Sequence, residues 1–301
     1  MRSTTSSQAY APDPRNAEVK VYLNGEFVHR DAAQVSVFDA GFVCGDGVWE
    51  GLRLVNGRLI ALQAHLDRLF EGALSIDLDI GLSRTEVEQV LWDTVAVNGM
   101  SDGAHLRLMV TRGRKSTPNQ DPRFIIGKAT VICVAEYKVV DAQAKARGIT
   151  LFTSTYRCST PDVFDLRLNS HSRLNLIQAL LQALHAGADE ALMLDSRGFV
   201  ASCNSTNFFI VRKGELWTSS AHCCFNGITR QTLVRLAREN GIKVHEGEFT
   251  LSQVYAADEA FVTGTLAGIT PVRMVDGRPL GSGSRDLIER LDELYRRSLS
   301  Q

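Results

Sequence analysis

Two Asn-Gly pairs near the start of the chain place the strongest limits on how it can fold. Asn24-Gly25 and Asn56-Gly57 each lie between two segments that are rich in apolar and β-branched residues. The flanking segments are Val19–Leu23 with Glu26–His29, and Trp49–Val55 with Arg58–Leu62. Asn-Gly accepts the positive φ angles of a tight two-residue turn. The sequence therefore predicts two β-hairpins within the first 62 residues.

Helices and further strands are expected after the second hairpin. Apolar residues recur with helical spacing over 62–74, where Leu62, Leu66, Leu69, Phe70, Ala73 and Leu74 share one face. A second helix is predicted over 84–97, and strands are predicted over 105–112 and 130–137. Hairpins, helices and strands in this order are typical of an α+β domain.

The second half of the chain alternates strands with helices. The predicted strands are 149–153, 190–195, 199–211, 243–246 and 260–263, and the predicted helices are 172–186, 229–240 and 284–298. The polar, Ala-rich segment 138–147 is the candidate linker. We therefore expect a disordered leader over 1–18, a small α+β domain over 19–137, a linker over 138–147 and a larger domain over 148–301.

Composition excludes several classes of protein. The 301 residues carry a net charge of −1, with 44% hydrophobic and 22% charged residues. Neither a nucleic-acid surface nor a membrane-binding face is indicated, because both need clustered positive charge. The six cysteines form no C-x-x-C pair, and no metal site is expected. The polar first 16 residues lack the apolar region of a signal peptide, so a cytoplasmic protein is expected.

Three short segments have the composition of phosphate-binding sites. Asn226–Arg230 opens a predicted helix, whose N-terminal amides suit an anion. Thr263–Gly268 is a small-residue loop after a strand, and His65–Leu69 contains Arg68 beside a buried helix stripe. Each has a simpler interpretation as a helix cap, an ordinary turn or a surface residue.

Taken together, these segments resemble class IV aminotransferases, the group of branched-chain and D-amino-acid aminotransferases and aminodeoxychorismate lyase. The resemblance runs from Val19 onward and lies in the order of Val37–Phe42, Gly45–Arg53, His65–Leu69, Gly187–Leu192, Ser205–Phe209, Gly227–Arg230 and Thr263–Pro271. It implies a two-domain α+β and α/β protein of pyridoxal-phosphate fold type IV. A small domain, a larger barrel-like domain and a homodimer are then expected, with a small-molecule substrate.

The resemblance also implies a set of cofactor-binding residues. Arg68, the backbone of Ile228 and Thr229, and Thr265 would hold the phosphate of pyridoxal 5′-phosphate. Leu266 belongs to the same loop as Thr265. Asn207 would support the site.

Two positions depart from the family pattern. Matching the pattern around the catalytic lysine over Asn169–Ala183 places Asn169 at the lysine position, and Ser202 falls where a glutamate would meet the pyridine nitrogen. An amide cannot replace the lysine amine, which binds the cofactor covalently and moves a proton. Loss of general base catalysis alone costs about 10²–10⁴ in rate. Pyridoxal or pyridoxamine phosphate is therefore expected to bind without a covalent bond.

Other residues could replace the lost base. His171 would lie on the same face as Asn169 if this segment is extended, although a loop histidine bonded to neighbouring serines is the simpler interpretation. The seven lysines are predicted to be solvated, and they are Lys20, Lys115, Lys128, Lys138, Lys145, Lys213 and Lys243. The basic segment Thr111–Lys115 is interpreted as a solvated loop, with closure over an acidic substrate group as the alternative. Asp165 and Arg167 are expected to pair with each other or to cap a turn.

Three functions remain open at this point. The first is a pyridoxal-phosphate enzyme that transfers an amino group of a branched-chain-like amino acid or an amine by a non-standard mechanism. The second is a catalytically silent homodimer that binds a phosphorylated cofactor or serves as a scaffold. The third is a different reaction in a remodelled pocket.

Overall fold

The computed structural model describes residues 6–140, 142–281 and 285–300, and the chain forms two compact units. The small unit comprises Pro12–Val139 and Leu168–Arg173, and the large unit comprises Met1–Ala11, Val140–Arg167 and Leu174–Gln301. The division at residue 139 falls inside the linker predicted over 138–147. The return of Leu168–Arg173 to the small unit was not predicted.

The small unit is built on a six-stranded antiparallel sheet in the order β3-β2-β7-β6-β4-β5. Its strands are β2 (Lys20–Leu23), β3 (Glu26–His29), β4 (Gly47–Val55), β5 (Arg58–Leu59), β6 (Ala104–Thr111) and β7 (Thr130–Tyr137). Both predicted hairpins are confirmed. At their turns Asn24 and Asn56 have φ of 51° and 48°, and the glycines that follow also have positive φ.

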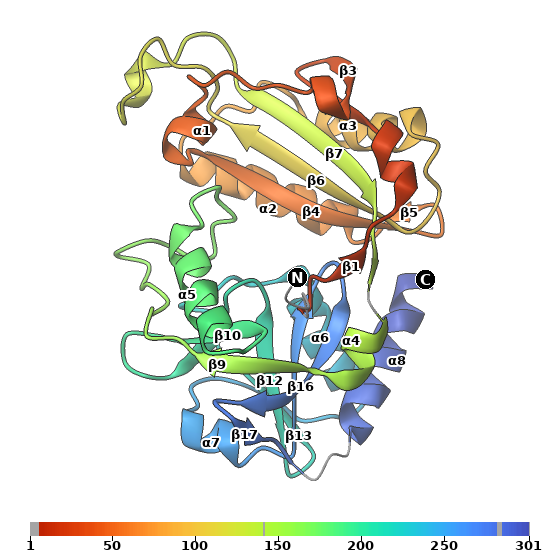
Figure 1. The fold of residues 1–301 in the computed structure, drawn as a ribbon, viewed down its shortest axis with the longest axis vertical. Helices are drawn as coiled ribbons and strands as arrows, with labels where there is room; N and C mark the ends of the chain where they lie inside the picture. The colour runs from red at the N-terminus through yellow and green to blue at the C-terminus, as the bar shows by residue number, and fades with distance from the viewer. Residues whose placement is uncertain (1–5, 141, 282–284, 301) are drawn as a thin grey trace. The chain divides into compact units, whose positions relative to one another are not determined.

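Two helices cover one face of this sheet, α2 (Leu62–Ser75) and α3 (Arg84–Val97) (Figure 1). A capping box of Ser83 and Glu86 fixes the start of α3, as their spacing allows. Leu66 and Leu69 are buried, but Leu74, expected on the same face, is 80% exposed. Leu74 lies five residues after Leu69, which turns it roughly 140° away from the buried stripe.

The large unit is built on a curled mixed sheet of nine strands, in the order β11-β10-β9-β16-β15-β12-β13-β14 with β17 beside β16. The strands are β9 (Ile149–Thr153), β10 (Glu190–Leu194), β11 (Val200–Cys203), β12 (Asn207–Arg212), β13 (Glu215–Thr218), β14 (Val244–Glu246), β15 (Glu259–Gly264), β16 (Gly268–Val275) and β17 (Arg278–Pro279). The strand predicted over 199–211 is interrupted, because the amide of Cys203 donates to the carbonyl of Thr206 and turns the chain.

The helices of the large unit are α4 (Ala142–Arg147), α5 (Leu174–His185), α6 (Ile228–Glu239), α7 (Leu251–Tyr255) and α8 (Asp286–Ser300). Alternate residues of β12 serve two cores. Phe208 packs with α7, whereas Phe209 packs with α6 and α8. The start predicted for the last helix, Ser284, lies outside the described residues. Among those described, no helix has the length and apolar character needed to cross a membrane.

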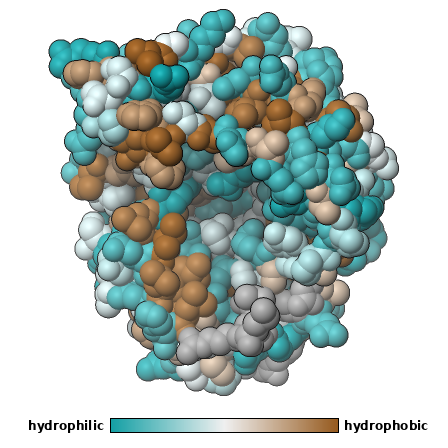
Figure 2. Space-filling model, turned by 45° about the horizontal axis from the view of Figure 1, so that its top comes forward, coloured by the Kyte–Doolittle hydropathy of each residue, from teal (hydrophilic) through white to brown (hydrophobic). Residues whose placement is uncertain are grey.

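One face of α5 exposes apolar side chains. These are Leu174, Ile177, Leu181 and Leu184, each between 43% and 68% exposed. Their spacing of three or four residues places them in one stripe along the helix. Figure 2 shows hydrophobic side chains at the surface in brown, among them a column at the lower left, the side on which α5 lies in Figure 1. This stripe has no cover within the described part of the large unit.

Several segments expected to be loose have defined structure. Over residues 6–18, predicted as part of the leader, Ser7 is buried, and β1 (Tyr10–Ala11) and a 3₁₀ helix (Pro14–Glu18) follow. The predicted linker contains β8 (Val139–Val140), which pairs with β1, and α4. Residues 1–5 and 141 of these two segments lie outside the described residues.

The basic segment between β6 and β7 also differs from its interpretation as a solvated loop. Arg112 forms an ion pair with Asp46, in which Nε and Oδ2 are 2.7 Å apart. Lys115 is only 1% exposed, and its Nζ donates to the carbonyl of Asp121 at 2.8 Å. The lysine is buried because a backbone oxygen of the same loop accepts from its ammonium. The remaining short helices of the small unit are α1 (Ala40–Cys44) and the 3₁₀ turns Arg30–Ala32 and Pro122–Phe124, the last of which lies between β6 and β7.

Candidate functional site

The segment that carries Asn169 lies along β4 in the small unit. The amide of Trp49 donates to the carbonyl of Asn169, and the amide of His171 donates to the carbonyl of Gly47. Between them Ser170 forms an isolated antiparallel bridge with Val48. The segment is therefore extended, as the prediction for His171 assumed, and both Asn169 and Ser170 are buried.

Both ends of the Asn169 amide make hydrogen bonds. Its Nδ2 donates to the carbonyl of Trp49 at 2.5 Å, and Nη2 of Arg173 donates to its Oδ1. Glu50 Oε1 lies 3.5 Å from the same Nδ2. An asparagine whose donor and acceptor are both engaged is held in one orientation. At this position the chain thus presents a fixed amide and no amine.

A buried carboxylate lies next to this amide. Glu50 is 1% exposed and accepts from Arg68 Nε and Nη2, each at 2.7 Å, and its Oε2 is 2.6 Å from His65 Nδ1. Burial raises the pKa of Glu50, but the hydrogen bonds from Arg68 and His65 outweigh it and hold the pKa below its ordinary value. Arg68, which the resemblance assigns to the cofactor phosphate, is thus bonded to a carboxylate of the chain itself.

Two further arginines surround the indole ring of Trp49. The Arg107 guanidinium carbon lies 3.3 Å from the ring centroid, and that of Arg173 lies 5.3 Å from it. Burial lowers the pKa of each arginine to about 10, and Glu50 opposes the shift. Within the described residues Arg107 makes no hydrogen bond or ion pair. Three guanidiniums (Arg68, Arg107, Arg173) therefore face one carboxylate, an excess of positive charge that suits an anionic ligand.

The histidine proposed as a replacement base lies in this cluster. Burial, with Arg107 and Arg173 nearby, lowers the pKa of His171 to about 4. Its Nε2 is buried and has no hydrogen-bond partner among the described residues. At neutral pH the imidazole is neutral and can accept a proton, but a pKa this low makes it a weak base.

In the large unit, Ser202 and Asn207 lie on consecutive strands. Ser202 Oγ donates to the carbonyl of Thr206 at 2.8 Å, and Asn207 Nδ2 lies 3.5 Å from the same hydroxyl. Asn207 also donates to the carbonyl of Phe225 at 2.6 Å and accepts from the amide of Gly227 at 3.2 Å. Asn207 therefore ties β12 to the chain that leads into α6.

The first turn of α6 is open to an acceptor. Gly227 caps the helix without any side-chain hydrogen bond, so the amides of Ile228 and Thr229 begin a helix that lacks an N-cap acceptor. A side chain at Gly227 would not fit, because its Cβ would lie 2.4 Å from Asn207 Oδ1.

The loop between β15 and β16 carries the other predicted residues, Thr265 and Leu266. Thr263, at the end of β15, pairs across the sheet with Asn207. The Oγ1 of Thr263 is buried and has no hydrogen-bond partner among the described residues. The β15–β16 loop and the start of α6 are thus linked through Asn207, within one unit.

These residues fit one end of pyridoxal phosphate. The open helix start, its required glycine and the unpaired Thr263 hydroxyl are features of a site for phosphate oxygens. At the positions implied for the other end of the cofactor, Asn169 and Ser202 supply neither an amine nor a carboxylate. The chain therefore has the groups for non-covalent binding and lacks the group for a covalent bond at these positions.

The predicted site residues divide between the units. Arg68, Asn169 and His171 belong to the small unit, and the large unit holds Ser202, Asn207, Ile228, Thr229, Thr265 and Leu266. Glu50, Arg107 and Arg173 were not predicted. One signal could have found Arg107. Its strand alternates, which places a charged residue on the face of β6 opposite Leu106 and Leu108, both fully buried.

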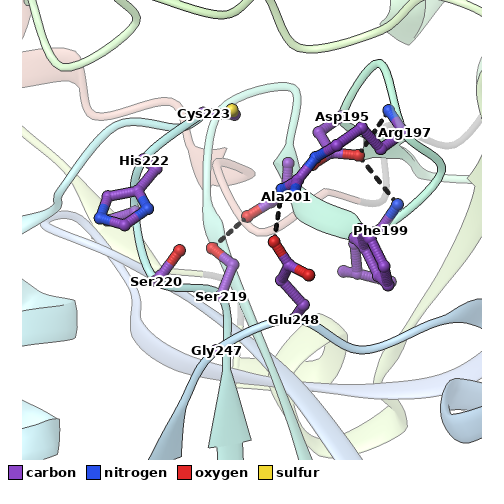
Figure 3. A pocket seen from close by; sticks show the side chains of 12 residues that line it. Asp195, Arg197, Phe199, Ala201, Ser219, Ser220, His222, Cys223, Gly247 and Glu248 are labelled. Carbon is purple, nitrogen blue, oxygen red and sulfur yellow. Dashed lines mark hydrogen bonds and ion pairs between the residues drawn. The ribbon is translucent and has the colours of Figure 1, made fainter.

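A small pocket elsewhere in the large unit contains none of these residues. Figure 3 shows it between Asp195, Arg197 and Glu248 on one side and Ser219 to Cys223 on the other. Arg197 bridges Asp195 and Glu248. Burial raises the pKa of Cys223, so its thiol is not activated. The described residues contain no cluster of three metal-ligating side chains.

The family whose sequence model matches the chain is described as "Amino-transferase class IV", and the match covers residues 47–275. The branched-chain-amino-acid aminotransferase-like protein 2 of Arabidopsis thaliana is 37% identical over 298 residues, which is 98% of this chain and 53% of that protein. The chain therefore spans about half the length of that relative. A putative branched-chain-amino-acid aminotransferase of Methanocaldococcus jannaschii is 42% identical, covering 88% of this chain and 90% of that protein.

A solved structure has the same fold. The branched-chain aminotransferase of the thermophilic archaeon Thermoproteus uzoniensis, solved with norvaline, superposes with a TM-score of 0.83 and is 32% identical. The match covers 93% of this chain and 94% of that one.

Proposed function

The chain belongs to the class IV aminotransferases, and from that membership we propose that it binds pyridoxal or pyridoxamine phosphate without a covalent bond and transfers the amino group of a small amino acid. The matched relatives named as branched-chain aminotransferases make an amino acid with an apolar side chain the first substrate to test, and an amine the second. The transfer of the amino group and the choice of substrate are both part of this proposal.

The observation that carries the proposal is the hydrogen bonding of the Asn169 side-chain amide. Its amide is buried and bonded at both ends, to the carbonyl of Trp49 and to Arg173. In the small unit, no described contact brings a lysine amine to Asn169. Lys115 donates to the carbonyl of Asp121, and Lys138 pairs with Glu136 at 3.0 Å.

Each end of the ligand would be held by different groups of the chain. The first turn of α6, with Thr265 and Leu266, would bind the phosphate, and Arg68 would add charge. Arg107 and Arg173, both near the ring of Trp49, would bind a substrate carboxylate. His171 would accept the proton from the substrate carbon. When bound, the cofactor would supply the group that exchanges the nitrogen and the ring that accepts electrons.

A second candidate function is a catalytically silent protein that binds the phosphorylated cofactor. Two observations favour it. The pKa of His171 is about 4, which makes this histidine a poor base at neutral pH. Ser202 Oγ is already committed to the carbonyl of Thr206, so it provides no negative charge for a pyridine nitrogen.

We further propose a homodimer in the cytoplasm. The exposed stripe Leu174, Ile177, Leu181 and Leu184 on α5 is a surface that a second copy could cover. The six cysteines are all free thiols, which suits a reducing compartment.

A single-turnover experiment tests the function. The protein is mixed with pyridoxal phosphate and leucine, and 2-oxo acid and pyridoxamine phosphate are measured against the same mixture without protein. Amino-group transfer predicts both products in equal amounts, faster than in the blank. Rates equal to the blank for leucine, other amino acids and amines alike would reject the enzyme and leave the silent protein. Arg107→Met is the matched variant, expected to lose substrate binding while cofactor binding is kept.

A further inference from the structure

The segment 6–11, which the sequence suggested was part of a disordered leader, is fixed to the large unit. We call it the strap. Ser7 is 3% exposed, although it stands near the start of the chain in a polar, small-residue segment. Gln8 N donates to Ser6 Oγ at 3.0 Å, which folds the strap into a turn before β1. A polar serine is buried only where its groups find partners.

Those partners belong to a single carboxylate, Glu190 at the start of β10. The amide and hydroxyl of Ser7 donate to Glu190 Oε1 at 2.8 and 2.5 Å, and Ser6 Oγ lies 3.4 Å from the same oxygen. The other oxygen, Oε2, accepts from Thr206 Oγ1 at 3.1 Å. Glu190 is 1% exposed and forms no ion pair within the described residues. Two of the three residues that bind it therefore come from the strap.

Through Glu190 the strap is linked to the residues that are predicted to bind the cofactor phosphate. Thr206, which shares Glu190 with Ser7, directly precedes Asn207, the residue that joins β12 to the start of α6. On the other side, Gln8 reaches Gly264. A Cβ built on Gly264 would lie 3.3 Å from Gln8 Nε2 and 3.5 Å from Thr206 Cγ2. Gly264 directly precedes Thr265 and Leu266 in the loop predicted to hold phosphate.

The strap thus lies beside Gly264 of the β15–β16 loop, and through Glu190 it is linked to Thr206, the neighbour of Asn207, which bonds the start of α6. Gly264 is the last residue of β15 and pairs with Gly268 of β16. A glycine at position 264 leaves room for the Gln8 amide, which a larger residue would displace.

We propose that Gln8 and Ser7 are positioning residues, which hold the 264–266 loop and Thr206 in the geometry that binds the cofactor phosphate. This inference rests on the proposed function, since it assigns these residues to the same phosphate. The strap acts through Gly264 and Thr206 and does not touch the ligand itself. Binding and strap docking are then coupled, so each strengthens the other by the same factor.

Isothermal calorimetry with pyridoxamine 5′-phosphate measures the effect of the strap on ligand binding. Gln8→Ala and Ser7→Ala are expected to raise Kd about 5- to 10-fold, within the range typical of coupled sites. Gln8→Ala removes no group that anchors the strap to Glu190, so its unfolding midpoint in urea should match the wild type. Ser252→Ala, at an exposed position of α7, is the control and should leave Kd unchanged. Equal Kd values in all four proteins would overturn the inference.

Limited proteolysis measures the reverse effect, that of ligand binding on the docking of the strap. Tyr10 is 43% exposed, so chymotrypsin should cut after it whenever the strap detaches. Pyridoxamine phosphate is expected to slow that cleavage in the wild type about 5- to 10-fold. Cleavage at the same rate with and without saturating ligand would overturn the inference and leave the proposed function intact. A wild-type protein that binds no ligand in calorimetry would instead reject the proposed function and this inference with it.

Discussion

The surroundings of Asn169 and the start of α6 satisfy their polar groups in opposite ways. Around Asn169 the groups are charged, and Glu50, Arg68 and Arg173 are bonded to one another or to the amide. At the start of α6 the buried Arg230 is paired with Glu246, and the groups left open are neutral, because Gly227 offers no cap and Thr263 Oγ1 has no partner among the described residues. In the first region the exceptions among the described residues include Arg107, the Nε2 of His171 and the hydroxyl of Ser170. The second is built to receive an acceptor from outside, which is what a bound phosphate provides.

The largest change should come from restoring an amine. Asn169→Lys is expected to convert reversible binding of pyridoxal phosphate into a covalent bond at position 169. The excess of arginines nearby lowers the pKa of an added amine and favours its neutral, reactive form. Intact mass after borohydride reduction should show one cofactor per chain. Asn169→Ala should stay unlabelled, and an unlabelled Asn169→Lys would show that position 169 does not reach the cofactor.

The next largest change concerns the ion pair that completes the charged region. Arg68→Met should lower the free energy of unfolding by about 3 kcal/mol, because it removes the bidentate ion pair of the buried Glu50 and leaves His65 as its remaining close ion-pair partner. Arg167→Ala breaks the exposed pair with Asp165, which the sequence predicted and the structure confirms, and should cost about 0.5 kcal/mol or less. Urea denaturation measures both. Equal losses would mean that burial of Glu50 does not matter.

Acid should weaken the small unit through its buried histidines. Burial lowers the pKa of His105 to about 3 and that of His171 to about 4. Both stay neutral in the folded chain while the unfolded chain takes up protons below about pH 6.5, so stability falls as pH drops through this window. Each histidine should contribute about 2 kcal/mol of this loss near pH 4.5.

Urea denaturation at pH 7 and near pH 4.5 tests this contribution. His105→Gln should reduce the dependence on pH, and His29→Gln, at an exposed position, should leave it unchanged. A pH dependence in His105→Gln as steep as that of the wild type would contradict the assignment.

A smaller effect is expected at the neutral region. Gly227→Ala would place a Cβ 2.4 Å from Asn207 Oδ1 and push apart the start of α6 and β12. We expect about a tenfold weaker Kd for pyridoxamine phosphate, equivalent to roughly 1.4 kcal/mol. Gly247→Ala is the matched control, because Gly227 has a φ of −61°, Gly247 also lies outside the left-handed region, and an added Cβ at Gly247 would meet no atom within 4 Å. Unchanged binding in Gly227→Ala would remove α6 from the site.

Local signals in the sequence predicted most of the elements. The Asn-Gly turns and the helix spacing over 62–74 and 84–97 depend on residues close in sequence, and these elements formed as expected. The burial of Lys115 could not be foreseen, because its acceptor is a loop carbonyl of Asp121 whose direction has no sequence signature. The break at 204–206 was missed for the same reason, since it depends on a turn of the backbone within an apolar run.

The candidate site was predictable only where the resemblance to a family supplied it. Asn169 and Ser202 were found by matching a pattern, and the segment around Asn169 proved to be extended and buried. The arginines around Trp49 come from β6 and from the segment after residue 167, so their proximity is a product of the fold. The strap was interpreted as disordered because its polar composition does not reveal that Glu190, more than 180 residues away, accepts its hydrogen bonds.

The most direct test asks whether a phosphorylated pyridine binds this protein without a bond to any lysine. The wild type is saturated with pyridoxal phosphate, treated with borohydride and dialysed, and its intact mass is compared with an untreated sample, while calorimetry on the same preparation gives Kd. A measurable Kd with an unchanged mass is the predicted result. A mass increase of one reduced cofactor, located to a lysine by peptide sequencing, would contradict it.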